Sequence, residues 1–144
     1  MAVYHFSEGA FDLPSGWLDQ SVHMLVRGDG PPASGPTLVI NREPLAAPFA
    51  EQVAANVSGM RRTLPGFKLI EEKRIVVGTL PAISVELSWK KDSAAVTQKV
   101  IFVAYASVML HITLSGGLGS WETARAELER VVASIRFRSP ESVA

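Results

Sequence analysis

The feature that most constrains the fold is a long run, residues 100–121, without any Asp, Glu, Lys or Arg. On length alone, such a run is sufficient to cross a bilayer as a helix. Its composition favours strands instead, because residues 100–105 and 108–114 are rich in β-branched and aromatic side chains. The run then ends in a glycine-rich loop, residues 115–120. We therefore expect two buried strands here and no membrane-spanning helix.

The rest of the chain contains further strand patterns. Apolar or alternating stretches occur at residues 2–6, 20–27, 37–42, 68–77, 82–90 and 94–105. From Ile83 to Lys90 apolar and polar side chains alternate strictly, which predicts one buried and one solvated face. The sequence Lys-Asp-Ser at 91–93 predicts a hairpin turn into the next strand.

Two stretches have the spacing of amphipathic helices, residues 47–63 and 121–135. Their apolar stripes are Phe49, Val53, Val57, Met60 and Leu64 in the first, and Trp121, Ala124, Leu128, Val131 and Ile135 in the second. Ser120 is a suitable N-cap for the second helix, and Arg125, Glu129 and Arg130 are expected to face water. Runs of strands with only two helices predict an α+β domain, an antiparallel β-sheet with both helices packed on one face.

Composition limits the classes of partner and the compartment. The 144 residues suit a single domain, residues 1–138, followed by a flexible C-terminal tail, residues 139–144. Fourteen basic and fourteen acidic residues give no net charge, so nucleic acid is not an expected partner. The chain has no cysteine, and its first residues lack a signal-peptide pattern, so we expect a cytoplasmic protein. Hydrophobic residues make up 47% of the chain, which predicts some apolar surface.

Catalytic and metal-binding patterns do not converge. His5, His23 and His111 are far apart and none forms a His-x-x-x-His pair. Asp19 and Ser21 near His23 do not make a triad, because neighbours along one strand alternate faces. Gly116, Gly117 and Gly119 do not match a phosphate-binding loop, and the carboxylates Glu43, Glu51, Glu71 and Glu72 fit solvated positions. We expect no enzyme activity, no cofactor and no metal.

Two segments carry a family resemblance: Phe11-Asp-Leu-Pro-Ser-Gly-Trp-Leu-Asp-Gln-Ser-Val-His-Met24 and Leu64-Pro-Gly-Phe67. Together with the chain between and after them, they resemble the DcrB-like family, which has a PsbP-like fold, and most of all the Eag chaperones of bacterial type VI secretion. The resemblance implies a cytoplasmic homodimer without stable membrane insertion. It also implies that the protein shields the hydrophobic N-terminal transmembrane segments of a secreted effector of prePAAR/Rhs type and assists its loading.

The resemblance further implies an effector-binding groove. Its residues in this chain are Val22, Met24, Thr37, Val39, Asn41, Asn56, Leu64 and Gln98. Asn41 stands where the family has a serine and Asn56 where it has a glutamine, while Trp17, Pro14, Pro65 and Gly66 are assigned to the fold and its turns. Taken alone, the apolar members also suit a core, and Gln98 suits a buried amide bonded to the backbone.

The residues themselves support a binding role in one respect. In the strand around Met24, both sides are largely apolar, with Val22 and Val26 on one side and Leu25 on the other. A single layer of helices covers only one side of such a strand. The alternative to a chaperone is a carrier or regulatory domain of the same fold that binds a lipid or another small apolar ligand.

Overall fold

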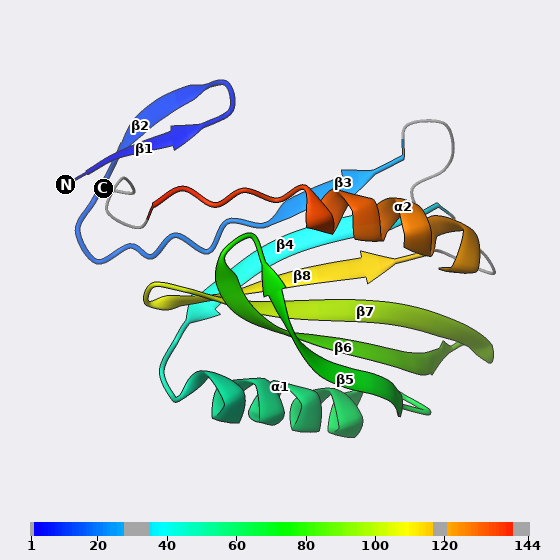
Figure 1. Cartoon of the computed structure of the whole chain (residues 1–144). Coiled ribbons are helices and arrows are strands. Elements are labelled where there is room, and N and C mark those ends of the chain that lie inside the picture. Colours follow the sequence, from blue (N-terminus) through cyan, green and yellow to red (C-terminus); the bar gives the residue numbers. More distant parts are fainter. Residues whose placement is uncertain (1, 28–34, 117–120, 140–144) are drawn as a thin grey trace.

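The computed structural model describes residues 2–27, 35–116 and 121–139. The elements follow in the order β1 (Ala2–Phe6), β2 (Gly9–Leu13), β3 (His23–Val26), β4 (Thr37–Pro44), α1 (Phe49–Thr63), β5 (Lys68–Val77), β6 (Leu80–Lys91), β7 (Ala94–Tyr105), β8 (Val108–Ser115) and α2 (Trp121–Ala133). β1 and β2 form a separate hairpin, and the other strands form a six-stranded antiparallel sheet in the order β3-β4-β8-β7-β6-β5 (Figure 1). The α+β class expected from the sequence is confirmed.

The charge-free run forms the centre of the sheet. β8 pairs along its whole length with the part of β7 from Gln98 to Tyr105, and Phe102, Val103 and Met109 within this pair are fully buried. None of the helices in the described residues has the length and apolar character needed to cross a bilayer. The prediction of two buried strands in place of a membrane helix is therefore confirmed.

The two helices lie on opposite faces of the sheet, so the prediction that both pack on one face is wrong (Figure 1). Along β7, Phe102 packs in one core with Val53 and Val57 of α1. Its neighbour Val103 packs in the other core with Leu128 of α2. Successive side chains of a strand point to opposite faces, so a sheet whose central strands are apolar on both sides needs a cover on both.

The apolar stripes of the helices are confirmed with one exception. In α1, all five expected residues are buried or pack against the core. In α2, Val132 is buried in place of Val131, which is 43% exposed, because the residue four positions after Leu128 faces the sheet rather than the residue three positions after it. Ser120, the expected N-cap, and residues 140–144 of the expected tail lie outside the described residues.

The supposed solvated face of β6 is covered by α2. Ser84 and Glu86 are buried on that face. Arg125 Nη2 lies 3.4 Å from Glu86 Oε1, and Glu129 Oε1 accepts hydrogen bonds from Arg125 Nε at 3.1 Å and from Lys99 Nζ at 2.9 Å. Arg125 and Glu129 are thus half-buried partners and not simply water-facing residues, which corrects both predictions. Buried charges require such partners.

The hairpin at 91–93 is confirmed. Lys91 pairs with Ala94, and Asp92 and Ser93 between them have φ values of 51° and 72°. Positive φ at both central residues is the requirement of the two-residue turn that matches the twist of antiparallel strands.

Candidate binding face

Among the described residues, nothing covers one part of the sheet on the side where α1 lies. Along β4, Leu38 and Ile40 belong to the core under α2. Thr37, Val39 and Asn41 alternate with them and therefore point to the α1 side, where they are half-buried and belong to neither core. α1 packs over β6, β7 and the start of β8, and so it does not cover these residues.

The edge strand β3 adds exposed apolar side chains to this surface. Met24 pairs with Val39 and Val26 pairs with Thr37, so all four share one face. Met24 is 64% exposed and Val26 41%. Val22, just before the strand, is 60% exposed. We call this surface the open face; its residues are Met24, Val26, Thr37, Val39, Asn41, Thr113 and Ser115.

Gln98 borders the open face at the end nearest Thr37. It lies opposite Ser115, which in turn lies opposite Thr37, so the three form one row across β7, β8 and β4. Trp89 Nε1 donates a hydrogen bond to Gln98 Oε1 at 3.0 Å, and Gln98 Nε2 donates one to Ser115 Oγ at 2.9 Å. The partners of this amide are side chains and not the backbone. An amide nitrogen has two hydrogens, so one donor remains for another acceptor.

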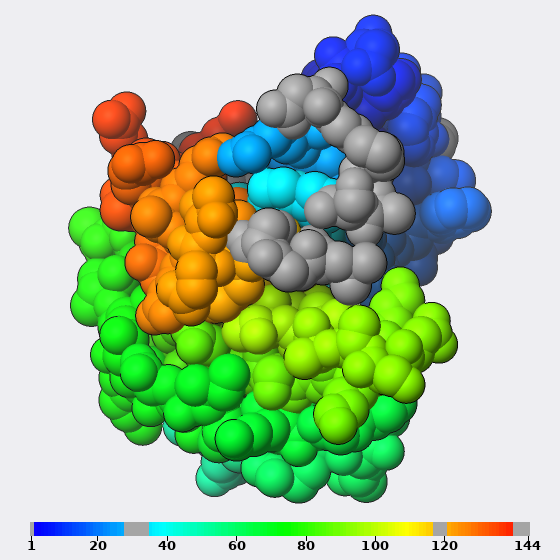
Figure 2. Space-filling view, turned by 90° about the vertical axis from the view of Figure 1, so that its right-hand side faces the viewer, coloured from blue at the N-terminus to red at the C-terminus, as the bar shows by residue number. Residues whose placement is uncertain are grey.

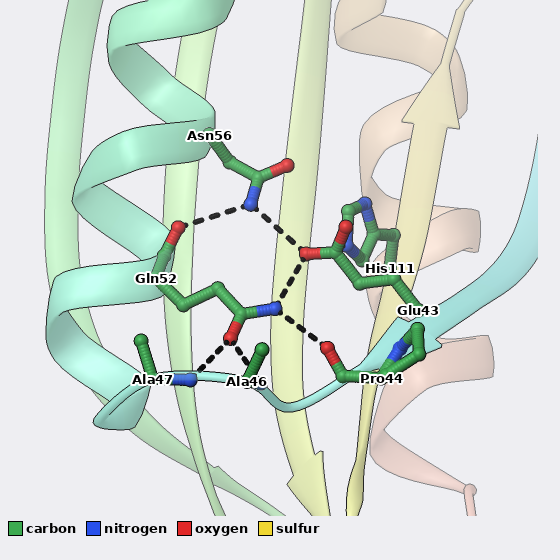
Figure 3. Close-up of polar contacts among 7 residues, drawn as sticks. All are labelled: Glu43, Pro44, Ala46, Ala47, Gln52, Asn56 and His111. Carbon is green, nitrogen blue, oxygen red and sulfur yellow. Dashed lines mark hydrogen bonds and ion pairs between the residues drawn. The ribbon is translucent and has the colours of Figure 1, made fainter.

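A polar cluster borders the open face at its other end (Figure 3). Glu43, which follows Asn41 on the same side of β4, accepts hydrogen bonds at its Oε1 from Gln52 Nε2 at 2.9 Å and from Asn56 Nδ2 at 3.0 Å. His111 Nε2 lies 3.3 Å from the same oxygen. Glu43 is therefore half-buried and bonded, and the prediction that it is simply solvated is wrong.

The cluster holds Glu43 as a carboxylate. Burial raises its pKa, but the hydrogen bonds from Gln52 and Asn56 and the nearby His111 outweigh burial, so the net pKa is lowered. The His111 ring packs edge-on against Phe102, with 5.0 Å between the ring centroids. A fixed negative charge thus lies at this end of the open face.

Gln52 also holds the start of α1. Its Oε1 accepts hydrogen bonds from the backbone N–H groups of Ala46, at 2.8 Å, and Ala47, at 3.1 Å. The N-cap residue Pro48 has no side-chain hydrogen bond of its own, so Gln52 supplies partners to the chain entering the helix. The sequence did not predict that Gln52, Glu43 and His111 form one polar cluster. The only indication of it in the sequence is that these polar residues stand beside apolar stripes.

The structure brings most of the expected groove residues to one region, and whether they contact a guest stays a prediction. Met24 and Val39 are direct neighbours, Asn41 pairs with His111, and Asn56 joins the same end through Glu43. Leu64 differs from the others, because it ends α1 and packs against the core beneath that helix.

Two hollows lie on the opposite side of the sheet, against α2. One of about 190 Å³ lies between α2, β3 and the start of β4; Figure 2 shows the cyan β4 below the blue β3 and beside the orange α2. The other, of about 480 Å³, lies between α2 and β5 and includes Lys99 and Glu129. Among the described residues, no group of three or more His, Asp or Glu side chains is placed to hold a metal.

Comparison with known proteins shows what the chain is similar to. It is 27% identical over 117 residues to a protein of Pseudomonas aeruginosa PAO1 named Effector EagT6, a match that covers 80% of this chain and 81% of the relative. The fold is similar to that of a Pseudomonas aeruginosa protein of unknown function, a putative regulator, with a TM-score of 0.82, 24% identity and coverage of 96% and 97% of the two chains. It is less similar to LpqN of Mycobacterium tuberculosis, which is involved in cell envelope biogenesis, with a TM-score of 0.50, 15% identity and coverage of 81% and 83%. The DcrB family matches residues 8–134, nearly the whole sequence, and the chain therefore belongs to the DcrB family.

Proposed function

We propose that this protein is a cytoplasmic chaperone of a type VI secretion effector. In this proposal a homodimer holds the hydrophobic N-terminal transmembrane segments of the effector, keeps them from aggregating and assists their loading. The similarity to Effector EagT6 supports an association with such an effector. The open face is the surface proposed to hold the segment.

The observation that carries this proposal is the apolar character of the open face, which no helix or strand of the described residues covers. Met24 and Val26 are exposed on it, and Val39 is half-buried, although none of the three belongs to a core. Burial of apolar surface is worth roughly 25 cal/mol per Å². A guest helix laid on this face would gain that energy at Met24, Val26 and Val39 at once.

The dimensions suit a helix. The eight residues of β4 extend about 26 Å at roughly 3.3 Å per residue. The 15 residues of α1 extend about 22 Å at 1.5 Å per residue. A transmembrane helix of about 20 residues is about 30 Å long. From Thr37 to Glu43, where the open face and its polar end lie, the strand advances six residues, about 20 Å at roughly 3.3 Å per residue, which is enough for about two thirds of one such helix beside α1.

The polar groups at the two ends are suited to orient the guest. Gln98 has a free amide hydrogen at one end, and the Glu43 carboxylate lies at the other. A hydroxyl or a backbone carbonyl of the guest is a partner for Gln98, and a lysine, an arginine or a helix N-terminus is a partner for Glu43. Such pairs would fix the direction in which the helix lies.

Co-expression tests the proposal. This chain and an effector N-terminus that includes its predicted transmembrane segments are produced together, and the soluble fraction is analysed by size-exclusion chromatography with light scattering. We expect a soluble complex that contains two copies of this chain. An effector segment that stays insoluble with several candidate effectors, while this protein elutes alone, would count against the chaperone.

A small-ligand carrier is the second candidate, favoured by the hollow of about 480 Å³ between α2 and β5. That volume is within the roughly 300–1,000 Å³ of ordinary ligand pockets. Apolar side chains including Ile75, Ile101 and Val132 line it together with Lys99. Mass spectrometry of the purified protein under native conditions would detect a bound lipid, and this result would favour the carrier.

A further inference from the structure

The first part of the chain adds no residue to either core, although β3 pairs with β4 and Asp19 Oδ2 lies 4.0 Å from Arg42 Nη1. Among the described residues 2–27, not one is buried. The β1–β2 hairpin forms a two-stranded sheet of its own, which stands apart from the six-stranded sheet (Figure 1). We call residues 2–22 the N-terminal arm.

The arm is nevertheless ordered by specific contacts. The rings of Tyr4 and Phe11 stack with 5.2 Å between their centroids, and Phe6 lies 5.9 Å from Phe11. The Tyr4 hydroxyl donates to Asp19 Oδ1 at 3.3 Å, and Ser21 N donates to the same oxygen at 2.9 Å. These contacts explain Asp19 and Ser21 of the Trp-x-Asp-x-Ser segment as a joint that holds the hairpin to the chain leading into β3.

Large apolar side chains on the arm remain exposed. Trp17 is 68% exposed, Leu18 75%, and Phe6 and Phe11 48% each. Trp17, expected from the sequence to serve the fold, has little to pack against in one protomer. An isolated two-stranded hairpin is marginally stable at best in water, and an apolar face on a third element is what makes such hairpins persist. The arm therefore requires a partner surface.

We propose that this partner is the arm of a second copy of the chain, so that the arms form the contact of the homodimer around a two-fold axis. This contact would be that of the homodimer proposed above, and its relevance to guest binding rests on that proposed function. A two-fold contact uses the same patch on both copies. Each arm therefore supplies the apolar partner surface for the other arm, and no further protein is needed.

The area agrees with this assignment. Aromatic side chains bury roughly 150–250 Å² each, so the exposed parts of Phe6, Phe11 and Trp17, 48% to 68% of each, amount to about 100 Å² per residue, and we take the same value for Leu18, which is 75% exposed. Two arms together would remove about 800 Å² from water at these side chains alone, which is in the range of small, weak interfaces. The chain carries no net charge, so two copies do not repel one another over long range.

The arm leads directly into the open face. Val22 follows the Asp19–Ser21 joint by one residue, and Met24 begins the exposed edge at β3. A second copy seated on the arm would therefore stand beside the β3 edge of the open face, the side opposite α1. Dimer formation and guest binding are then coupled through residues 19–24.

The test measures oligomeric state without any guest. The double variant Trp17→Glu/Leu18→Glu is compared by light scattering with the wild type and with Val76→Glu, whose residue is 69% exposed on β5 at the other edge of the sheet. We expect the wild type and Val76→Glu at twice the 15.5 kDa mass of the chain, and the double variant at the mass of one chain with an unchanged circular dichroism spectrum. A monomeric wild type, or a double variant that stays dimeric, would overturn the proposal.

Cross-linking keeps the test decisive if the double variant does not fold. The chain has no cysteine, so Leu18→Cys and Val76→Cys each introduce a single thiol. A short bismaleimide should join two copies of Leu18→Cys and leave Val76→Cys uncoupled; the reverse pattern would refute the arm contact. Neither measurement includes a guest, so failure of the arm contact is distinguished from failure of the chaperone proposal.

Discussion

Replacing Met24 with alanine should weaken guest binding without changing the stability of the fold. Met24 is 64% exposed on the open face. Full burial of a methionine side chain is worth about 1.5–3 kcal/mol, so covering its exposed two thirds is worth about 1–2 kcal/mol. At 1.4 kcal/mol per tenfold change, Met24→Ala should raise the Kd about 5- to 30-fold. Its exposure predicts a change in unfolding free energy of about 0.5 kcal/mol or less.

The chain offers a matched control one residue later. Leu25 is 59% exposed on the same strand but points to the opposite side of the sheet, toward α2. Leu25→Ala should therefore change the Kd less than about twofold, well under 1 kcal/mol. The assay is fluorescence anisotropy with a labelled peptide of about 20 Leu and Ala residues flanked by lysines, matched to the length of a membrane span. Equal weakening by both variants, or weakening by Leu25→Ala alone, would refute the assignment of the open face.

Three further predictions concern the polar groups. Gln98→Ala leaves two hydrogen-bonding side chains without their partner and should lower the unfolding free energy by about 1–3 kcal/mol; an unchanged midpoint in urea would contradict this. The pKa of Glu43 is lower in the folded protein than in the unfolded chain, where it is about 4.3. Ionised Glu43 therefore stabilises the fold at pH values above about 4.3, and this stabilisation is lost as the pH falls through the lower pKa of the folded state. Glu43→Gln should therefore flatten the loss of stability in urea melts below about pH 4, and the exposed Glu51→Gln should not. Removing Glu129 leaves the buried charge of Lys99 unpaired, so Glu129→Ala should lower the unfolding free energy by about 1–2 kcal/mol. The loss is smaller than for a fully buried pair because Glu129 is 43% exposed. Lys99→Met should leave the unfolding free energy nearly unchanged, and thermal melting of both variants measures the difference.

The motif predicted which groove residues lie near one another, but not which of them have side chains that remain accessible. The register of β3 on β4 places Met24 beside Val39, as a shared face requires. The amide of Asn56 is engaged with Glu43, and Leu64 is part of a core. Sequence position alone does not tell whether such a side chain is exposed, hydrogen-bonded or part of a core, because this depends on which strand lies under it.

The sequence by itself determined the elements. β5 and β7 have the expected bounds, and the expected stripe of α1 is the one that packs on the sheet. These features depend on local periodicity, which each stretch carries in its own residues. The hairpin strand β2 was missed, because its side chains are exposed and give no alternating pattern.

Only the tertiary structure decided which surfaces are covered. Alternation on β6 predicted a solvated side, yet α2 covers Ser84 and Glu86 there, with Arg125 beside Glu86 and Glu129 paired with Lys99 of β7. β3 and β4 also carry apolar side chains on both faces, but on one of these faces their side chains form the open face. A strand encodes two faces but not what packs on each of them, because that depends on where distant helices lie. The cover, and hence the binding surface, comes from long-range packing.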